Sequence, residues 1–548
     1  MALLIIGSLV SPVDNRSYKT LPNALIYVGD DGLIKAINHI VGVPITTIHI
    51  EAILGEVGHC GEFEILHLAR GEFLIPGFID THTHAPQFPN VGAGQQYELL
   101  KWLENVTFPM EAKFKNVDFA RKAYTKIVKR IIDAGTTTCC YYGTLHLEAT
   151  KELARIVHEY GQRAFIGKCN MDRESPSYYV ERTDESVPHT EELIKYIRLL
   201  TPSKDGSLYV YPVLTPRFAI ATTDELLKRI RVLVDSDPLL TIQTHISENP
   251  SEVRRTKELF KHLSKPEKPI TYAGVYDHYH LLRNNTILAH AVYLEEEEWK
   301  LVKEKNCGIS HCPTSNFNLT SGVAKVGDML DRGVKVGLGT DVSGGFSPSI
   351  LTAVRHASIA AKVVAIADLN SFAYRPLTVA TLFWLATLGG AQVCNLERKA
   401  GSLEVGKSFD AIVVNIRNTS TPSPPPVSPH NLNLWGVGDD EDLGLDIRRR
   451  KDNNSIADGD AEVDIADENQ LKEELDAMLE RLLFCGDDRN LRRVYVQGRW
   501  IGGTEGRYDS TGVNVNATSL WRSNEAMSRR LFGSLHVIHV MYIRWIVA

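Results

Sequence analysis

The sequence predicts an α/β protein whose main part is a (β/α)₈ barrel of the TIM type, and two observations indicate this fold class. Between residues 76 and 390, short apolar runs alternate with longer amphipathic stretches, as parallel strands alternate with the helices that cover them. On both sides of this region, short strand-like runs are separated by turns instead. Alternation sustained over roughly 300 residues favours a parallel sheet that closes into a barrel.

The N-terminal segment, residues 1–75, is expected to supply strands outside the barrel. Met1–Val10 is apolar but lacks a positively charged start and a convincing cleavage site, so we interpret it as a buried strand rather than a signal peptide. Ala24–Val28, followed by Gly29–Gly32, predicts a strand that runs into a turn.

The barrel region, residues 76–390, contains several clear examples of each element. Apolar runs that we interpret as strands include Tyr209–Leu214, Leu239–Gln243, Thr286–Ala289 and Val334–Leu338. Amphipathic stretches that we interpret as helices include Asp118–Ala134, Glu191–Leu200 and Asp224–Asp235.

After residue 390 the chain returns to strands, in residues 391–416 and again in 471–503. Residues 417–470 are first rich in Ser, Thr and Pro and then strongly charged, a composition typical of a disordered insertion. The tail, residues 504–548, has no clear period and is either a genuine extension or a reading-frame error. Its apolar end, Leu531–Ala548, is interrupted by charge and too short for a span, so we expect no membrane segment.

The composition is ordinary for a soluble globular protein, and a mildly acidic enzyme is compatible with it. The formal net charge of −7 disfavours a broad nucleic-acid-binding surface. Eight cysteines without a C-x-x-C pair are too sparse for a disulfide framework, so we expect a reducing, cytoplasmic location. Gly401–Ser408 matches the P-loop expression, but the strand-like Phe409–Val414 follows it where phosphate binding needs a helix, so we interpret it as a turn.

Two histidines at strand spacing are the first sign of a metal site. His82 and His84 end the segment that begins at Pro76, and residues i and i+2 of a strand face the same way. Three more predicted strands end in ligand-type side chains, at His245, His290 and Asp341. Because catalytic groups of a barrel come from the carboxyl ends of different strands, we expect these side chains to meet.

Three histidines and a carboxylate suit zinc or a related divalent ion, and our predicted ligands are His82, His84, His245 and Asp341. Such an ion lowers the pKa of a bound water toward about 7, which makes hydroxide available at neutral pH.

Three neighbouring side chains are expected to assist that site. We assign proton transfer to Glu248, three residues after His245, and we expect His290 to orient the hydroxide or polarise the attacked centre. His311 ends another candidate strand, and we leave it outside the ligand set because four protein ligands are already found.

The segments that combine these residues also carry a resemblance. They are Pro76–Gln87, Trp102–Pro109, Gly135–Thr138, Gly161–Lys168, Thr215–Phe218, His245–Asn249, Ser310–Pro313, Gly337–Gly345 and Gly486–Asn490. Together they resemble the amidohydrolase superfamily and, within it, the guanine deaminases. The resemblance covers most of residues 1–416 and resumes at about 471–502.

The resemblance implies hydrolysis of guanine to xanthine and ammonia, with one zinc ion per subunit. It implies a barrel flanked by a small β-sandwich from both chain ends, commonly within a homodimer. It also implies that Gln87, Arg217 and His290 contact the purine and that Phe218 packs on its ring. An amide offers a donor and an acceptor together, and a guanidinium offers donors to O6 or N7.

Our hypothesis for the reaction is attack of water on C2 of the ring. Asp341 accepts the water proton, and Glu248 protonates N3 and then the departing amine. Two other functions stay open: a related deaminase for another aromatic amine (a pterin, a triazine or an adenine nucleoside), or a non-catalytic hydrolase-like scaffold. A different zinc deaminase family is excluded because His146-Leu147-Glu148 is not accompanied by a P-C-x-x-C motif.

Overall fold

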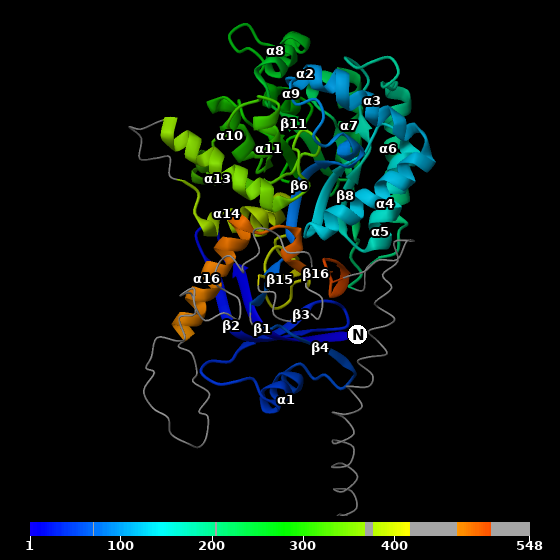
Figure 1. The fold of residues 1–548 in the computed structure, drawn as a ribbon. Coiled ribbons are helices and arrows are strands. Elements are labelled where there is room, and N and C mark those ends of the chain that lie inside the picture. Colours follow the sequence, from blue (N-terminus) through cyan, green and yellow to red (C-terminus); the bar gives the residue numbers. More distant parts are fainter. Residues whose placement is uncertain (70, 203–204, 368–375, 417–467, 506–548) are drawn as a thin grey trace, which may run out of the picture. The chain divides into compact units, whose positions relative to one another are not determined.

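Eight parallel strands form a nearly closed barrel within the unit Met1–Gly503 (Figure 1). The structure is a computed structural model that describes residues 1–69, 71–202, 205–367, 376–416 and 468–505. The barrel strands are β6 (Phe78–His84), β7 (Thr136–Tyr142), β8 (Arg163–Gly167), β10 (Val210–Pro216), β11 (Thr241–Ile246), β12 (Thr286–His290), β13 (Gly308–His311) and β14 (Lys335–Leu338). The two-residue strand β9 (Cys169–Asn170) pairs with β10.

Helices cover the barrel from outside (Figure 1). They are α4 (Val117–Asp133), α5 (Leu147–Tyr160), α6 (Thr183–Arg198), α7 (Asp224–Ser236), α8 (Pro250–Leu259), α9 (Tyr272–His278), α10 (Glu296–Glu304), α11 (Pro313–Asn318), α12 (Val326–Asp331), α13 (Ile350–Ala367), α14 (Val379–Ala386) and α15 (Leu388–Val393). In α4, the buried side chains of Tyr124, Ile127 and Ile131 recur at helical spacing and form one apolar face. The side chain of Asn116 accepts a hydrogen bond from the Phe119 amide and caps this helix.

The barrel closes between β14 and β6 through loop and side-chain hydrogen bonds, since the described strands form no ladder there. Thr81 donates from Oγ1 to the carbonyl oxygen of Leu338 at 2.9 Å, and the Thr340 amide donates to Asp80 Oδ1 at 3.0 Å. The Asp341 amide donates to the carbonyl oxygen of His82 at 2.9 Å. This closure therefore brings Asp341 beside His82.

A second sheet is built from both ends of the chain. Its strands are β1 (Ala2–Pro12), β2 (Tyr18–Val28), β3 (Ile34–His39), β4 (Phe63–His67), β5 (Glu72–Pro76), β15 (Ala411–Asn415), β16 (Leu491–Val496) and β17 (Arg499–Gly502). They form one continuous sheet, and a single apolar cluster joins Ile5 and Ile26 from the N-terminal strands to Val413 and Tyr495 from the C-terminal ones. The predicted fold class, a (β/α)₈ barrel with a small β domain from both chain ends, is confirmed. That domain was predicted as a β-sandwich, and its described strands belong to one sheet.

Two helices were not expected from the sequence. α1 (Thr47–Glu56) lies within the segment for which we expected strands, and α16 (Glu468–Cys485) begins inside the predicted insertion and continues into residues 471–485. α16 buries Leu475, Leu479 and Leu482 at helical spacing and packs against β2 and α13. Residues 417–467 and 506–548, which make up most of the predicted insertion (417–470) and tail (504–548), lie outside the described residues.

Among the described helices, α13 is long and apolar enough to cross a membrane by length and composition alone. It packs against α11, α14 and α16, and it buries Ile350, Leu351 and Val354. A helix that covers a barrel passes the same test of length and composition, so α13 gives no reason to abandon the expectation of a protein without membrane segments.

Candidate active site

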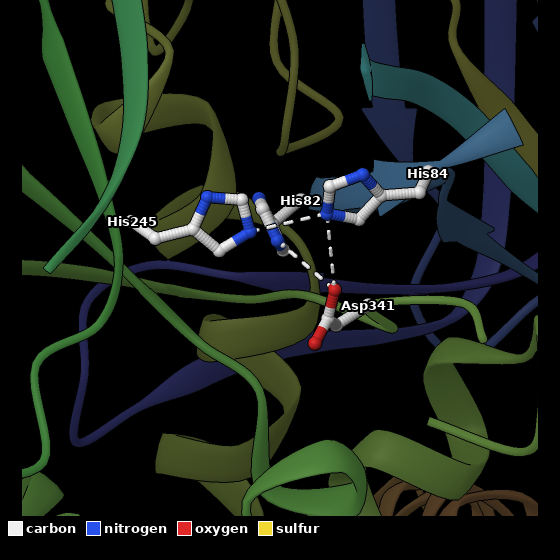
Figure 2. Close-up of side chains that lie close together, drawn as sticks. All are labelled: His82, His84, His245 and Asp341. Atoms are coloured by element: carbon white, nitrogen blue, oxygen red, sulfur yellow. Dashed lines mark hydrogen bonds and ion pairs between the residues drawn. The ribbon is translucent and has the colours of Figure 1, made fainter. Parts of the chain in front are cut away.

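The four predicted metal ligands lie together at the carboxyl ends of three barrel strands (Figure 2). One ligand atom from each of His82, His84, His245 and Asp341 lies within 4.8 Å of the others. Asp341 Oδ1 is 3.1 Å from His82 Nε2 and 3.4 Å from His84 Nε2. The Nε2 atoms of His84 and His245 are 3.1 Å apart. Three imidazoles and one carboxylate thus converge on one point.

The strands place these side chains in a way the sequence pattern anticipates. His82 and His84 both belong to β6, where alternate residues face the same side, and His245 lies in β11, one residue before its end. Asp341 comes three residues after β14 and has a φ of 46°, in the left-handed region. His290, the last residue of β12, also has a positive φ, of 75°. Such backbone is unusual outside glycine and turns both side chains into the site.

The protonation of the histidines fits a cation. His245 Nδ1 lies 2.6 Å from the carbonyl oxygen of Arg217, so Nδ1 donates and Nε2 keeps its lone pair for a metal. Burial lowers the pKa of His82, and burial together with His82 holds the pKa of His84 and His245 well below the usual value. Burial alone would raise the pKa of Asp341, yet the neighbouring His82 and His290 bring it far below its ordinary value. Neutral imidazoles and an ionised carboxylate are the donors that zinc prefers.

Glu248 and His290 stand beside the cluster. His290 Nε2 lies 3.4 Å from Glu248 Oε2 and 3.7 Å from Asp341 Oδ2, while its Nδ1 is 2.8 Å from Asn316 Oδ1. Ser321 donates from its hydroxyl to Glu248 Oε1 at 3.0 Å. Burial raises the pKa of Glu248 to about 7, an effect that His290 opposes. A carboxyl group with this pKa can both give and take a proton near neutral pH.

Gln87, Arg217 and Phe218 line a cavity of about 370 Å³ that also contains His84, His245, Glu248 and Asp341. All three side chains are nearly buried. The ring of Phe218 stands edge-on to that of His245, with centroids 6.4 Å apart. Polar side chains and an aromatic ring in one cavity suit a planar ligand that carries hydrogen-bonding groups.

The structure adds residues that the sequence reasoning did not single out. Trp102, the last residue of α2 (Leu99–Trp102), lines the cavity together with Leu103, the first residue of the π-helical η2 (Leu103–Thr107). Glu111, which ends α3 (Phe108–Glu111), lies behind Gln87 and Arg217 and binds both. Trp102 belongs to a segment that carried the resemblance, and this was the one available signal for it.

His311 is buried at the end of β13, near His290 but outside the cluster of four ligand-type residues. Burial, followed by the nearby His290, lowers the pKa of His311 to about 3. The structure therefore keeps His311 neutral and apart from the four predicted ligands.

The fold and the site together are those of a barrel hydrolase with side chains that could hold a metal ion, and the comparison with known proteins supports this class. Residues 73–501 match the amidohydrolase family, so the chain belongs to that family. A guanine deaminase from Dictyostelium discoideum is 38% identical over 496 residues, which covers 90% of this chain and 97% of the relative. The guanine deaminase of Rattus norvegicus is 38% identical over 439 residues, or 80% of this chain and 85% of the relative.

Solved structures agree with the sequence relatives. The crystal structure of a guanine deaminase from C. acetobutylicum, with guanine bound in its active site, superposes with a TM-score of 0.73 at 30% identity and covers 91% of this chain and 100% of that one. Within the amidohydrolases, the chain thus groups with the guanine deaminases, and it is a hydrolytic deaminase. The resemblance seen in the sequence is confirmed.

Proposed function

We propose that the chain catalyses the hydrolytic deamination of guanine to xanthine and ammonia, with one zinc ion per subunit, in purine catabolism or salvage. A single cavity carries this proposal, because it joins the cluster of His82, His84, His245 and Asp341 to the hydrogen-bonding wall of Gln87 and Arg217. The relatives named above are guanine deaminases, which supports the choice of substrate.

His82, His84, His245 and Asp341 would hold the zinc ion, and their donor chemistry fits it. Bound there, the ion would supply Lewis acidity that lowers the pKa of a water molecule toward about 7. Asp341 is held ionised by its histidine neighbours, so it is available to accept a proton from that water.

Glu248 is proposed to move the second proton. Its pKa of about 7 lets it protonate N3 of the ring and later the departing amine. His290 lies between Glu248 and Asp341, and we assign it the role of orienting the attacking water or polarising the C2 centre. Its Nδ1 contact with Asn316 fixes the ring for that task.

Gln87 and Arg217 are proposed to bind the purine edge, and Phe218 to pack on its ring. Arg217 carries only donors, which suit the O6 and N7 acceptors of guanine, while the Gln87 amide has both a donor and an acceptor. The same donors argue against an adenine nucleoside, which carries an amine where guanine has O6, and a pterin and a triazine are left to the substrate panel below.

The decisive experiment is ammonia release from guanine by purified protein of measured zinc content. We expect turnover that scales with zinc and a matching change in purine absorbance. A panel with a pterin, a triazine and adenosine should give far lower kcat/KM, and a preference for any of them would overturn the substrate assignment. Protein that binds no stoichiometric metal and releases no ammonia would support a non-catalytic scaffold instead.

We further propose a cytoplasmic homodimer. All eight cysteines lie in the described residues and are free thiols, as expected in a reducing compartment. Ile359, Val363 and Ile366 of α13 form an exposed apolar row that would suit a subunit interface, with Ile366 68% exposed. Light scattering of the purified protein tests the dimer, and a monomeric mass would contradict it.

A further inference from the structure

Glu111 is a fully buried carboxylate one layer behind the purine-facing wall of the cavity. It accepts four hydrogen bonds. The donors are Arg217 Nη1 at 2.7 Å, Arg217 Nη2 at 3.0 Å, Gln87 Nε2 at 2.8 Å and the Tyr179 hydroxyl at 2.5 Å. The pair with Arg217 is bidentate, the strongest arrangement available to these two groups. The two side chains proposed to hold the purine are therefore held by the same carboxylate.

The charge of Arg217 is the first consequence. Its guanidinium is 2% exposed, and burial alone would lower its pKa, but Glu111 raises the pKa above the ordinary value, so the cation is permanent. Phe108 packs on the same guanidinium at 5.3 Å and adds no charge. With Glu111 in place, the pair as a whole is neutral, although both of its side chains are buried.

The orientation of Gln87 is the second consequence. Its Nε2 donates to Glu111, and its Oε1 accepts a hydrogen bond from the Ser343 amide at 3.2 Å. Without such contacts, the side-chain amide could rotate by a half turn, which would swap the positions of its oxygen and nitrogen. The carboxylate on one side and the amide on the other leave a single orientation, so the donor and the acceptor that face the purine are fixed.

We propose that Glu111 is a positioning residue that makes the pocket select an uncharged purine, by neutralising Arg217 and fixing Gln87. This inference rests on the proposed function. Guanine is uncharged near neutral pH, whereas xanthine is a stronger acid and is partly anionic there. Because Glu111 already neutralises Arg217, the site binds the substrate through hydrogen bonds. The negative charge of the product adds little to its binding free energy, so the product can leave.

The test compares two purines that the enzyme does not deaminate, uncharged hypoxanthine and anionic urate, at pH 7.5. Their dissociation constants are measured by calorimetry on the zinc-loaded protein. The wild type should prefer hypoxanthine. Glu111→Gln should shift the ratio of the two constants toward urate by about tenfold or more, because it leaves a buried cation without its partner. The double variant E111Q/R217Q removes both charges and should return the ratio toward the wild-type value.

Tyr179→Phe is the matched control. It removes one hydrogen bond to Glu111 but keeps both charges, so its ratio should equal that of the wild type. A folded Glu111→Gln protein with an unchanged ratio would reduce Glu111 to a structural role and overturn the proposal. If Glu111→Gln does not fold, the wild type still decides, since tighter binding of urate than of hypoxanthine would refute a neutralised pocket.

The outcomes also separate this inference from the proposed function. Wild-type protein that shows the expected binding ratios but releases no ammonia from guanine would count against the deaminase reaction and leave the role of Glu111 intact. Wild-type protein that releases ammonia from guanine but binds urate more tightly than hypoxanthine, or binds neither, would overturn the role of Glu111 and leave the deaminase reaction intact.

Discussion

Replacing Glu248 with glutamine removes the proposed proton carrier while changing the shape of the side chain little. The glutamine oxygen can still accept the hydrogen bond from Ser321, which now meets Oε1 at 3.0 Å. No metal ligand is altered, because the contact of Glu248 with the site runs to His290 at 3.4 Å. The variant should therefore fold and bind zinc as the wild type does.

The loss of activity should be large. A carboxyl group with a pKa of about 7 is matched to neutral pH for both proton transfers, and a positioned acid–base group contributes about 10²–10⁴-fold to the rate. Because glutamine cannot exchange a proton, kcat should fall by that factor, equivalent to about 3–5 kcal/mol of transition-state stabilisation. KM should change much less, because Gln87 and Arg217 are untouched.

The assay is ammonia release at saturating guanine, with zinc measured in the same sample. Glu258→Gln is the matched control, since Glu258 lies on α8 but is exposed and pairs with Arg255 at 3.1 Å. It should keep wild-type kcat. A Glu248→Gln enzyme with full zinc and near-normal kcat would refute the assignment of proton transfer to Glu248.

Removal of zinc by a chelator should abolish ammonia release, and adding zinc back should restore it. His82→Ala lacks one of the proposed ligands, so added zinc should not restore its activity. Restored activity in this variant would contradict the proposed ligand set. Asp410→Ala should lower the free energy of unfolding by about 3–5 kcal/mol, measured by denaturant titration. The buried Arg163 lies 3.1 Å from Asp410 and would lose its ion-pair partner. A decrease below about 1 kcal/mol would contradict this prediction. Burial lowers the pKa of His311 from 6.5 to about 3. As the pH falls, this histidine is protonated in the unfolded chain before it is protonated in the folded protein, so the free energy of unfolding decreases below about pH 6.5. His311→Gln removes this group, so its free energy of unfolding should fall by about 2 kcal/mol less than that of the wild type when the pH is lowered to 5. A pH dependence of stability equal to that of the wild type would refute this prediction. Truncation after Gly503 should leave kcat unchanged, and a soluble but inactive product would show that the tail is needed.

Much of the barrel could be predicted because its elements repeat a local pattern. The stretch Asp118–Ala134 matches α4 within one residue at each end, and the run Thr286–Ala289 lies within β12. α6 begins at Thr183, earlier than the predicted Glu191, because its first turns contain Pro188 and charged residues that hide the period. α16 was missed for a related reason, since its leucines lie in a charged segment that continues from a low-complexity stretch.

The residues of the candidate site also fall into two groups, those that a local sequence pattern reveals and those that only the fold brings together. His82, His84 and His245 could be found because each lies at or near the end of an apolar strand, a feature visible in the sequence. Glu111 could not be found in this way. Its role depends on Gln87 and Arg217, which lie 24 and 106 residues away in the sequence and reach Glu111 only through the fold. Trp102 also enters the cavity from a connecting segment between β6 and β7, whose path no periodicity predicts.

Two carboxylates in one cavity, Asp341 and Glu248, have pKa values that are moved in opposite directions, and the cause lies in their neighbours. Both are buried, which raises the pKa of either group. Asp341 faces His82 and His84 within 3.4 Å and stays ionised, whereas Glu248 has a neutral hydroxyl and one histidine and holds its proton up to about pH 7. A pair of acids separated in this way can serve as proton acceptor and proton donor at the same pH. This separation is why we assign the water proton to Asp341 and the leaving-group proton to Glu248.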